Sequence, residues 1–310
     1  MKNFYSNLTL LFLFIGLIFL ACLFNKHQYF QKKEINPYLL SFLQGANSFT
    51  PIKKQYQETF STDAEAILIS SINNENKTLF KYNSEKQLPM ASITKLMTAI
   101  IVIDSYNPKN NIKISNDITK TEGDPKKLIS NETYSVKDLL YIMLIESNNE
   151  AAEALARKVD RTEFIKKMNQ KAFLLDMRDT KYLNPTGLDL ENGETNVTSA
   201  KDLEKLILHI TNKYKSIPEI LSNSKYTTYN QEGITRNSIN TNILLSESKD
   251  FLWGKTGFTN KAKGCLVLIS KPPNFSFFEK NYIINIIIGA KDRFDVARKL
   301  KTRIAKQFIW

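Results

Sequence analysis

Cysteine, histidine and glycine are scarce in this chain, and their scarcity excludes several classes of protein. The 310 residues include two cysteines, two histidines and ten glycines. Cys22 lies in an N-terminal apolar run and Cys265 in a predicted strand, so no disulfide framework is indicated. Neither His27 nor His209 has a cysteine or carboxylate at the spacing that zinc sites use. We therefore expect no metal centre.

Acidic residues are also in short supply relative to basic ones. Lysine and arginine number 43 against 31 aspartates and glutamates, which gives a formal net charge of +12. Such an excess attracts anionic partners, namely nucleic acid, anionic lipid or cell-wall polymer. Nucleic acid is the least favoured, because the sequence has no zinc-finger spacing, no RNP-like aromatic motif and no basic region with heptads. The hydrophobic content of 42% is ordinary for a globular protein, so most of the chain should fold.

A long uncharged apolar run occupies the N-terminus, from Leu8 to Phe24. As a helix it would reach about 26 Å, just short of the hydrocarbon core of a bilayer, which is about 30 Å thick. No A-x-A cleavage site follows, so residues 1–24 are predicted to be an uncleaved signal anchor, with lipidation of Cys22 as a minority alternative. Residues 25–62 are interpreted as a tether. The folded domain is predicted over residues 63–310, outside the cytoplasm.

Apolar periodicity and turn residues predict the main elements of that domain. A hairpin of two strands, with a turn at 73–76, precedes a buried helix that starts near residue 92. The last helix has a basic face around an apolar stripe, and packing on the final sheet is favoured over binding to a membrane surface. The predicted strands cover residues 64–70, 78–82, 251–257, 264–270 and 282–290, and the other helices cover about 136–146, 150–156, 161–177, a segment from 199, and 292–308.

Ser92 and Lys95 stand at the start of the buried helix. Three residues make nearly one helical turn, so the two side chains would project from the same face. Burial disfavours a charged amine and lowers its pKa, which would make Lys95 a base able to activate Ser92. Serine and lysine are abundant in the sequence, however, so chance is the better explanation of this pair alone.

Two further short motifs follow in the chain. Ser147-x-Asn149 lies in a predicted turn between two helices, where helix capping is an alternative explanation. Lys255-Thr256-Gly257 lies at the end of a predicted strand, where Gly257 would let a substrate backbone approach closely. Each motif is common by itself. Together and in this order, the three motifs match those of penicillin-binding proteins and class A β-lactamases.

From about Ala64 to the C-terminus, the sequence most resembles the serine-type D-Ala-D-Ala carboxypeptidases, the low-molecular-weight penicillin-binding proteins. The sequence departs from the family pattern at Asn148-Asn149-Glu150, where a small residue then Asn-Asp is usual, and at Lys263, which splits an Ala-Gly pair. The resemblance implies an α/β (α+β) fold, with an antiparallel five-stranded sheet flanked by helices and a mostly helical subdomain. The family-like blocks outside the three motifs are Asn184–Leu188, Thr198–Leu203, Phe258–Thr259 and Ala262–Cys265.

The same resemblance implies catalytic roles for three side chains. Ser92 would attack the carbonyl between two terminal D-alanines and form an acyl-enzyme. Lys95, kept neutral by burial and by the positive charge of Lys255, would take the serine proton. Ser147 would relay a proton to the leaving D-alanine.

The remaining site residues are implied to bind substrate. Asn149 would hold Lys95 and the substrate amide, and Lys255 with Thr256 would bind the terminal carboxylate. The backbone N–H groups of Ser92 and Phe258 would form the oxyanion hole, beside Gly257. No metal or organic cofactor is required. The expected partners are peptidoglycan stem peptides ending in D-Ala-D-Ala, β-lactam antibiotics as covalent inhibitors, and the membrane through the N-terminal segment.

Three alternatives remain open at this point. A class A β-lactamase needs a glutamate in an E-x-x-L-N segment, and the best match here begins with Thr180, followed by Leu183-Asn184, so a carboxypeptidase is preferred. An endopeptidase that cuts peptide cross-links would use the same residues. A non-catalytic wall-binding or antibiotic-sensing module is disfavoured because all the motif residues are present.

Overall fold

The computed structural model describes residues 51–54, 60–72, 77–123, 127–273 and 281–309, which belong to one unit, Thr50–Trp310. The predicted anchor (1–24), the tether up to residue 50 and the turn at 73–76 lie outside the described residues. Among the helices in the described part of the chain, none combines the length and the apolar character needed to span a membrane.

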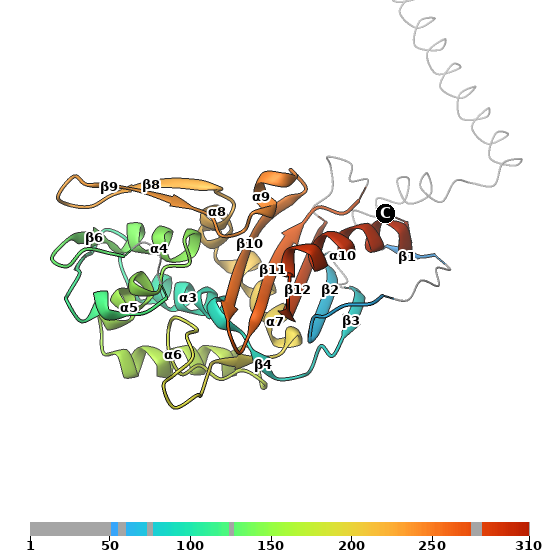
Figure 1. Cartoon of the computed structure of the whole chain (residues 1–310), viewed down its shortest axis with the longest axis horizontal. Helices are drawn as coiled ribbons and strands as arrows, with labels where there is room; N and C mark the ends of the chain where they lie inside the picture. The colour runs from blue at the N-terminus through green and yellow to red at the C-terminus, as the bar shows by residue number, and fades with distance from the viewer. Residues whose placement is uncertain (1–50, 55–59, 73–76, 124–126, 274–280, 310) are drawn as a thin grey trace, which may run out of the picture. The chain divides into compact units, whose positions relative to one another are not determined.

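A five-stranded antiparallel sheet forms the centre of the unit, in the order β10-β11-β12-β2-β3 (Figure 1). On β2, Leu68 faces one hydrophobic core while Ile67 and Ile69 face another. Both faces are therefore covered, which explains why the strand is a continuous apolar run. The predicted sheet is confirmed, and its strands are β2 (Ala66–Ile72), β3 (Lys77–Tyr82), β10 (Phe251–Thr259), β11 (Lys263–Ser270) and β12 (Tyr282–Ala290).

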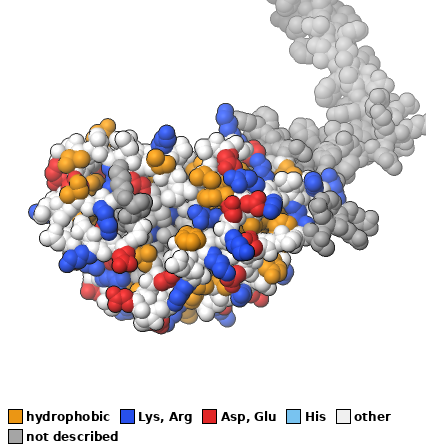
Figure 2. All heavy atoms as spheres, viewed as in Figure 1, with side chains coloured by type: hydrophobic (Ala, Val, Ile, Leu, Met, Phe, Trp, Pro, Cys, Tyr) orange, Lys and Arg blue, Asp and Glu red, His pale blue; other side chains and the backbone are white. Residues whose placement is uncertain are grey.

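Helices cover the two faces of the sheet. The C-terminal helix α10 (Arg293–Gln307) packs on β11 and β12 through its apolar stripe, and α7 (Ala200–Lys213) packs on β12 and β2. Packing of the last helix on the sheet, the favoured interpretation of its sequence, is confirmed. Three of its basic side chains, Arg298, Lys299 and Lys301, pair with carboxylates. Figure 2 shows acidic and basic groups interspersed on the visible face.

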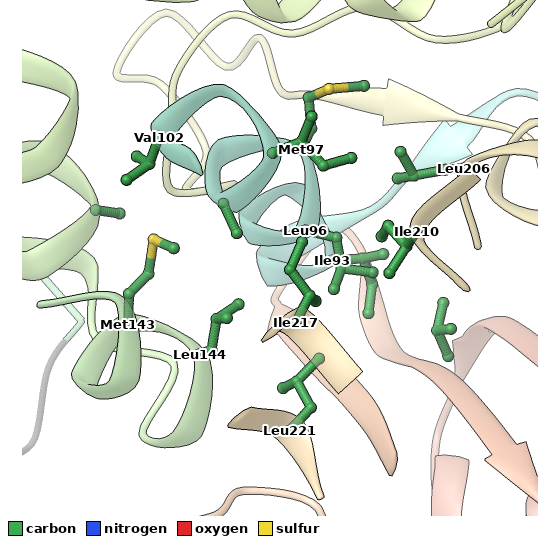
Figure 3. Packing of buried hydrophobic residues seen from close by; sticks show 14 of the residues in the cluster. Ile93, Leu96, Met97, Val102, Met143, Leu144, Leu206, Ile210, Ile217 and Leu221 are labelled. Atoms are coloured by element: carbon green, nitrogen blue, oxygen red, sulfur yellow. The ribbon is translucent and has the colours of Figure 1, made fainter. Parts of the chain in front are cut away.

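A mostly helical lobe packs beside the sheet, as the resemblance implied. Figure 3 shows its core, in which Leu96 and Met97 lie among side chains such as Leu144, Ile210 and Ile217. The first helix of the lobe is apolar nearly all round because it is surrounded by other elements. The helices of the lobe are α3 (Lys95–Ser105), α4 (Val136–Ile145), α5 (Asn149–Arg157), α6 (Arg161–Leu174) and α8 (Ser216–Leu221).

Short elements complete the described residues. Among the pairings that the sequence did not predict are a hairpin of β8 with β9 and a pairing of β1 with β13. The second pairing includes Ile52–Lys53, so the last part of the predicted tether belongs to the folded unit. The short elements are β1 (Ile52–Lys53), β4 (Leu88–Pro89), η1 (Ala91–Thr94), β5 (Asn111–Lys113), η2 (Ile118–Lys120), β6 (Thr133–Ser135), β7 (Val197–Thr198), β8 (Lys225–Tyr229), β9 (Thr235–Ile239), α9 (Leu244–Glu247) and β13 (Phe308–Ile309).

Candidate active site

Ser92 and Lys95 meet where a 3-10 turn leads into α3. Ser92 lies in η1, and Lys95 is the first residue of α3. A 3-10 turn has three residues per turn, so it places side chains three apart directly above one another. The Lys95 Nζ lies 2.8 Å from the Ser92 Oγ, and the lysine side chain is fully buried. The two side chains therefore share one face, as predicted, although the turn before Lys95 is tighter than an α-helix.

Two more acceptors fix the Lys95 amine. Its Nζ donates to the Asn149 Oδ1 at 2.6 Å and to the Thr186 carbonyl oxygen at 2.9 Å. The Thr186 carbonyl is held by a loop in which the Asn184 Oδ1 accepts from the backbone N–H groups of Thr186 and Gly187. The Asn184–Leu188 block therefore presents a carbonyl oxygen to the buried amine.

The Ser147–Asn149 motif lies between α4 and α5. Asn148 caps α5 by accepting from the Ala151 N–H at 2.7 Å. Helix capping therefore explains the middle residue of the motif, and it does not explain Ser147 or Asn149. Asn149 is the first residue of α5, and its Nδ2 donates to the Glu122 carbonyl at 2.9 Å. Ser147 has a φ of 64°, a left-handed conformation that is unfavourable for a serine.

Lys255 brings the third motif to Ser147. Lys255 is 1% exposed on β10, and its Nζ donates to the Ser147 Oγ at 2.7 Å. The Thr256 Oγ1 lies 2.6 Å from the Thr241 Oγ1. A Cβ added to Gly257 would lie 3.0 Å from the Ser92 backbone nitrogen, so a glycine here lets β10 run close to the serine.

The structure thus brings the predicted site residues together in two linked groups. Ser92, Lys95 and Asn149 form one group, and Ser147 with Lys255 forms the other. Thr256 and Gly257 follow Lys255 on β10, and Gly257 lies close to the Ser92 backbone. The side chain of Phe258 is 61% exposed, and the oxyanion-hole role of its backbone N–H stays a prediction.

Positive groups dominate the electrostatics of the site. Burial, then the neighbouring Lys95, then Arg293 lower the pKa of Lys255 well below its ordinary value of 10.5. Burial also lowers the pKa of Arg293, which begins α10. Convergence of these groups favours an anionic ligand, which would relieve their repulsion.

Sequence reasoning missed several contributors to the site. Thr186 and Thr241 lie in loops, and no local sequence pattern predicts that they contact Lys95 and Thr256. Arg293 did carry a signal, because a basic residue in the first turn of a helix opposes the helix dipole and needs another explanation. The sequence interpretation assigned it to the basic face of the last helix.

This fold, with two serines each paired to a buried lysine at the edge of an antiparallel sheet, defines the β-lactamase-like class of serine acyl-transfer proteins. Residues 53–290 match the model of the D-alanyl-D-alanine carboxypeptidase family, and the chain belongs to that family.

Similar proteins carry related names. The chain is 34% identical over 206 residues to a D-alanyl-D-alanine endopeptidase of Pseudomonas aeruginosa, covering 63% of each chain. It is 32% identical over 231 residues to the D-alanyl-D-alanine carboxypeptidase DacF of Bacillus subtilis, covering 71% of this chain and 57% of the relative. The chain thus spans less than two thirds of the length of these relatives.

Solved structures show the same fold. Penicillin-binding protein D2 from Listeria monocytogenes, in a cefotaxime-bound form, matches with a TM-score of 0.67 at 27% identity, over 81% of this chain and 100% of that chain. A D-alanyl-D-alanine carboxypeptidase from Mycobacterium tuberculosis matches with a TM-score of 0.71 at 21% identity, over 80% of this chain and 93% of that chain. The β-lactamase-like fold predicted from the motifs is confirmed.

Proposed function

We propose that the protein is a serine D-Ala-D-Ala carboxypeptidase that removes the terminal D-alanine from peptidoglycan stem pentapeptides. The observation that carries the proposal is the double pairing in one site, Lys95 with Ser92 and Lys255 with Ser147. One pair supplies a nucleophile with its base, and the other supplies a proton donor beside a cation for the substrate carboxylate. Membership of the family supports the substrate class.

Acylation begins at Ser92. Its Oγ attacks the carbonyl carbon between the two D-alanines, and the Lys95 Nζ at 2.8 Å takes the hydroxyl proton. The oxyanion that forms is held by the backbone N–H groups of Ser92 and Phe258. The close approach of Gly257 to the Ser92 nitrogen supports that arrangement.

Departure of D-alanine involves the second pair. The C–N bond breaks as the Ser147 Oγ gives its proton to the leaving nitrogen, and Lys255 with Thr256 holds the carboxylate of the leaving residue. The proton that Lys95 took restores the Ser147 hydroxyl. Water then attacks the Ser92 ester, releases the shortened peptide and returns a proton to Ser92.

An endopeptidase is the second candidate, and a specific observation favours it. The relative from Pseudomonas aeruginosa and a 35% identical relative from Escherichia coli are both named endopeptidases. A cross-link between stem peptides presents the same kind of amide beside a carboxylate, so the same residues would serve. For a β-lactamase the support is weaker, because the Thr180 Oγ1 is engaged by Thr198 and Asp202 and no glutamate takes its place.

The N-terminal run supports a location for this activity. We propose that residues 1–24 anchor the chain in the cell membrane and that the catalytic unit acts outside the cytoplasm, where peptidoglycan lies. Fractionation of cells that express the full chain should place it in the membrane pellet. Recovery of the full chain in the soluble fraction, after salt washing, would contradict the anchor.

Benzylpenicillin is expected to form a long-lived acyl adduct on Ser92 of the full-length protein in detergent. The adduct should appear as an intact-mass shift of one penicillin, and Ser92→Ala should abolish it. No adduct on the wild type, or an undiminished adduct on Ser92→Ala, would overturn the proposal.

Defined muropeptides distinguish the candidate activities. Release of free D-alanine from a monomeric pentapeptide supports the carboxypeptidase, and conversion of cross-linked dimers to monomers supports the endopeptidase. Rapid turnover of the penicillin itself would favour a β-lactamase.

Acylation by penicillin is expected to fall at alkaline pH, starting below the ordinary lysine pKa of 10.5. The reason is that the pKa of Lys255 is lowered, so rising pH removes the positive charge that attracts the penicillin carboxylate earlier than for an exposed lysine. Lys255→Arg should retain charge and move the alkaline limb to higher pH, because the arginine pKa is much higher. Identical alkaline limbs for the two proteins would rule out Lys255 as the titrating group.

A further inference from the structure

Two carboxylates flank the Ser147–Asn149 motif in the chain, and both are held by cations from elsewhere in the fold. Glu146 comes directly before the motif and Glu150 directly after it. The Glu146 side chain is 12% exposed, and Glu150 is fully buried. Carboxylates with so little access to water need strong partners.

Glu146 is paired with Arg236 from β9. The Arg236 Nε lies 3.0 Å from the Glu146 Oε1, and the Arg236 Nη2 lies 2.6 Å from the Glu146 Oε2, a bidentate geometry. The Ser238 Oγ adds a third hydrogen bond to the Glu146 Oε1 at 2.7 Å. The arginine side chain is only 6% exposed, so solvent and salt screen the attraction between the two charges only weakly.

Glu150 holds the backbone at Lys127 and Leu128. Its carboxylate lies 3.2 Å from the Lys127 Nζ and accepts from the Leu128 backbone N–H. The neighbouring Asn149 donates to the Glu122 carbonyl.

The two ion pairs converge. The Arg236 Nη1 donates to the Lys127 carbonyl oxygen at 3.0 Å, so one arginine links the carboxylate before the motif to the segment held by the carboxylate after it. We use the term ionic clamp for Glu146, Arg236, Lys127 and Glu150. It links the residues directly before and after the turn and contributes no atom to the pairing of Ser147 with Lys255.

The turn inside the clamp needs such support. Ser147 has a φ of 64°, a left-handed conformation that is unfavourable for a non-glycine residue. Backbone of this kind persists only where the surroundings determine it. A relaxed turn would carry the Ser147 hydroxyl away from the Lys255 amine, and a displacement of about 1 Å in such a group costs about 100-fold in rate.

We propose that Arg236 is a positioning residue that holds Ser147 and Asn149 in register with the two lysines, and so sets the rate of acyl transfer without contacting substrate. The inference rests on the proposed function of the site. It goes beyond that function because Arg236 belongs to none of the three motifs. Arg236 lies on a hairpin that the sequence did not predict.

Stopped-flow labelling of the full-length protein with a fluorescent penicillin tests the inference. Arg236→Gln is expected to slow the first-order acylation step by about 10- to 100-fold. The half-saturating penicillin concentration should stay within about two-fold, because Lys255 and Thr256 remain. Arg236→Lys should give an intermediate rate, since a lysine retains the charge but cannot form the bidentate pair.

The matched control is Arg298→Gln. Arg298 makes a similar bidentate pair with Glu247, at 2.9 and 2.6 Å, but on the outer surface at α10. Its removal should leave both acylation constants at wild-type values. The Glu146→Gln and Arg236→Gln double variant should be no slower than the slower single variant, because the two residues act as one unit.

Circular dichroism and an unfolding curve for each variant separate a positioning role from a purely structural one. If Arg236→Gln does not fold, Arg236→Lys replaces it as the decisive variant, because it keeps the charge and loses the bidentate bond to Glu146. A loss of about two- to five-fold in the acylation step is then expected. A wild-type acylation step in a folded Arg236→Gln, or in Arg236→Lys where that variant decides, would overturn the clamp. A wild type that takes no penicillin would instead overturn the proposed function.

Discussion

Lys95→Met is expected to slow the acylation of Ser92 by penicillin by at least about 10³-fold, which is the middle of the range of about 10²- to 10⁴-fold for loss of a general base. The Lys95 Nζ lies 2.8 Å from the Ser92 Oγ, and a methionine of similar length offers no group at that place able to take the serine proton. The substitution also leaves the Asn149 Oδ1 and the Thr186 carbonyl without the donor they share.

Time courses of labelling with a fluorescent penicillin, at equal concentrations of folded protein, measure this loss. Lys171→Met is the matched control, because Lys171 is a half-buried lysine that pairs with Asp104 away from the site. The control should acylate at the wild-type rate. If Lys95→Met acylates within ten-fold of the wild type, then Lys95 is not the base and another group must activate Ser92.

The elements predicted well from the sequence are those with strong local causes. The central strands are runs of β-branched and other apolar residues, and burial on both faces of the sheet produces that pattern. Two helix starts were also predictable from capping serines: Ser135 accepts from the Asp138 N–H at 3.0 Å, and Ser199 accepts from the Asp202 N–H at 3.2 Å. In each case the signal lies within a few neighbouring residues.

The unpredicted elements depend on partners far away in the chain. Strand β9 buries Arg236 and Ser238, so the alternation of its inner and outer faces cannot be read from hydrophobicity. Arg236 is tolerated inside because Glu146 neutralises it from 90 residues away. Strand β1 is two residues long, too short for any periodicity, and it exists because β13 pairs with it.

The candidate site divides in the same way. The residue types and their order were predictable, because the three motifs together match the motif set of a known family. They offer a serine, an amine and a carboxylate-binding cation, which acyl transfer can use. The geometry was not, because Lys95 finds Asn149 across 54 residues and Thr186 across 91. Contacts of that range are fixed by packing, such as that of Leu96 and Met97 in the core of the lobe (Figure 3).

Gly187→Ala is expected to destabilise the protein by about 2–5 kcal/mol, from left-handed backbone strain and overpacking together. Gly187 has a φ of 86°, which an alanine adopts only with strain. A Cβ at this position would lie 2.0 Å from the Ala91 carbonyl oxygen and 2.9 Å from the Ser92 nitrogen. These are backbone atoms beside the nucleophile, and Ala91 is itself at a φ of 46°, so relief requires movement of the active-site turn.

Gly233→Ala separates the two causes. Gly233 has a similar φ of 77°, but a Cβ there would meet nothing within 4 Å. This control should show the backbone strain alone, about 1–2 kcal/mol, with acylation unchanged.

Urea unfolding curves and penicillin labelling of both variants make the comparison. Gly187→Ala should lose more stability than Gly233→Ala and should also acylate slowly in its folded fraction, because the displaced loop carries the Thr186 carbonyl that holds Lys95. Equal losses in the two variants would mean that the contact between this loop and the Ser92 turn tolerates a methyl group, and that the loop does not fix the position of the base.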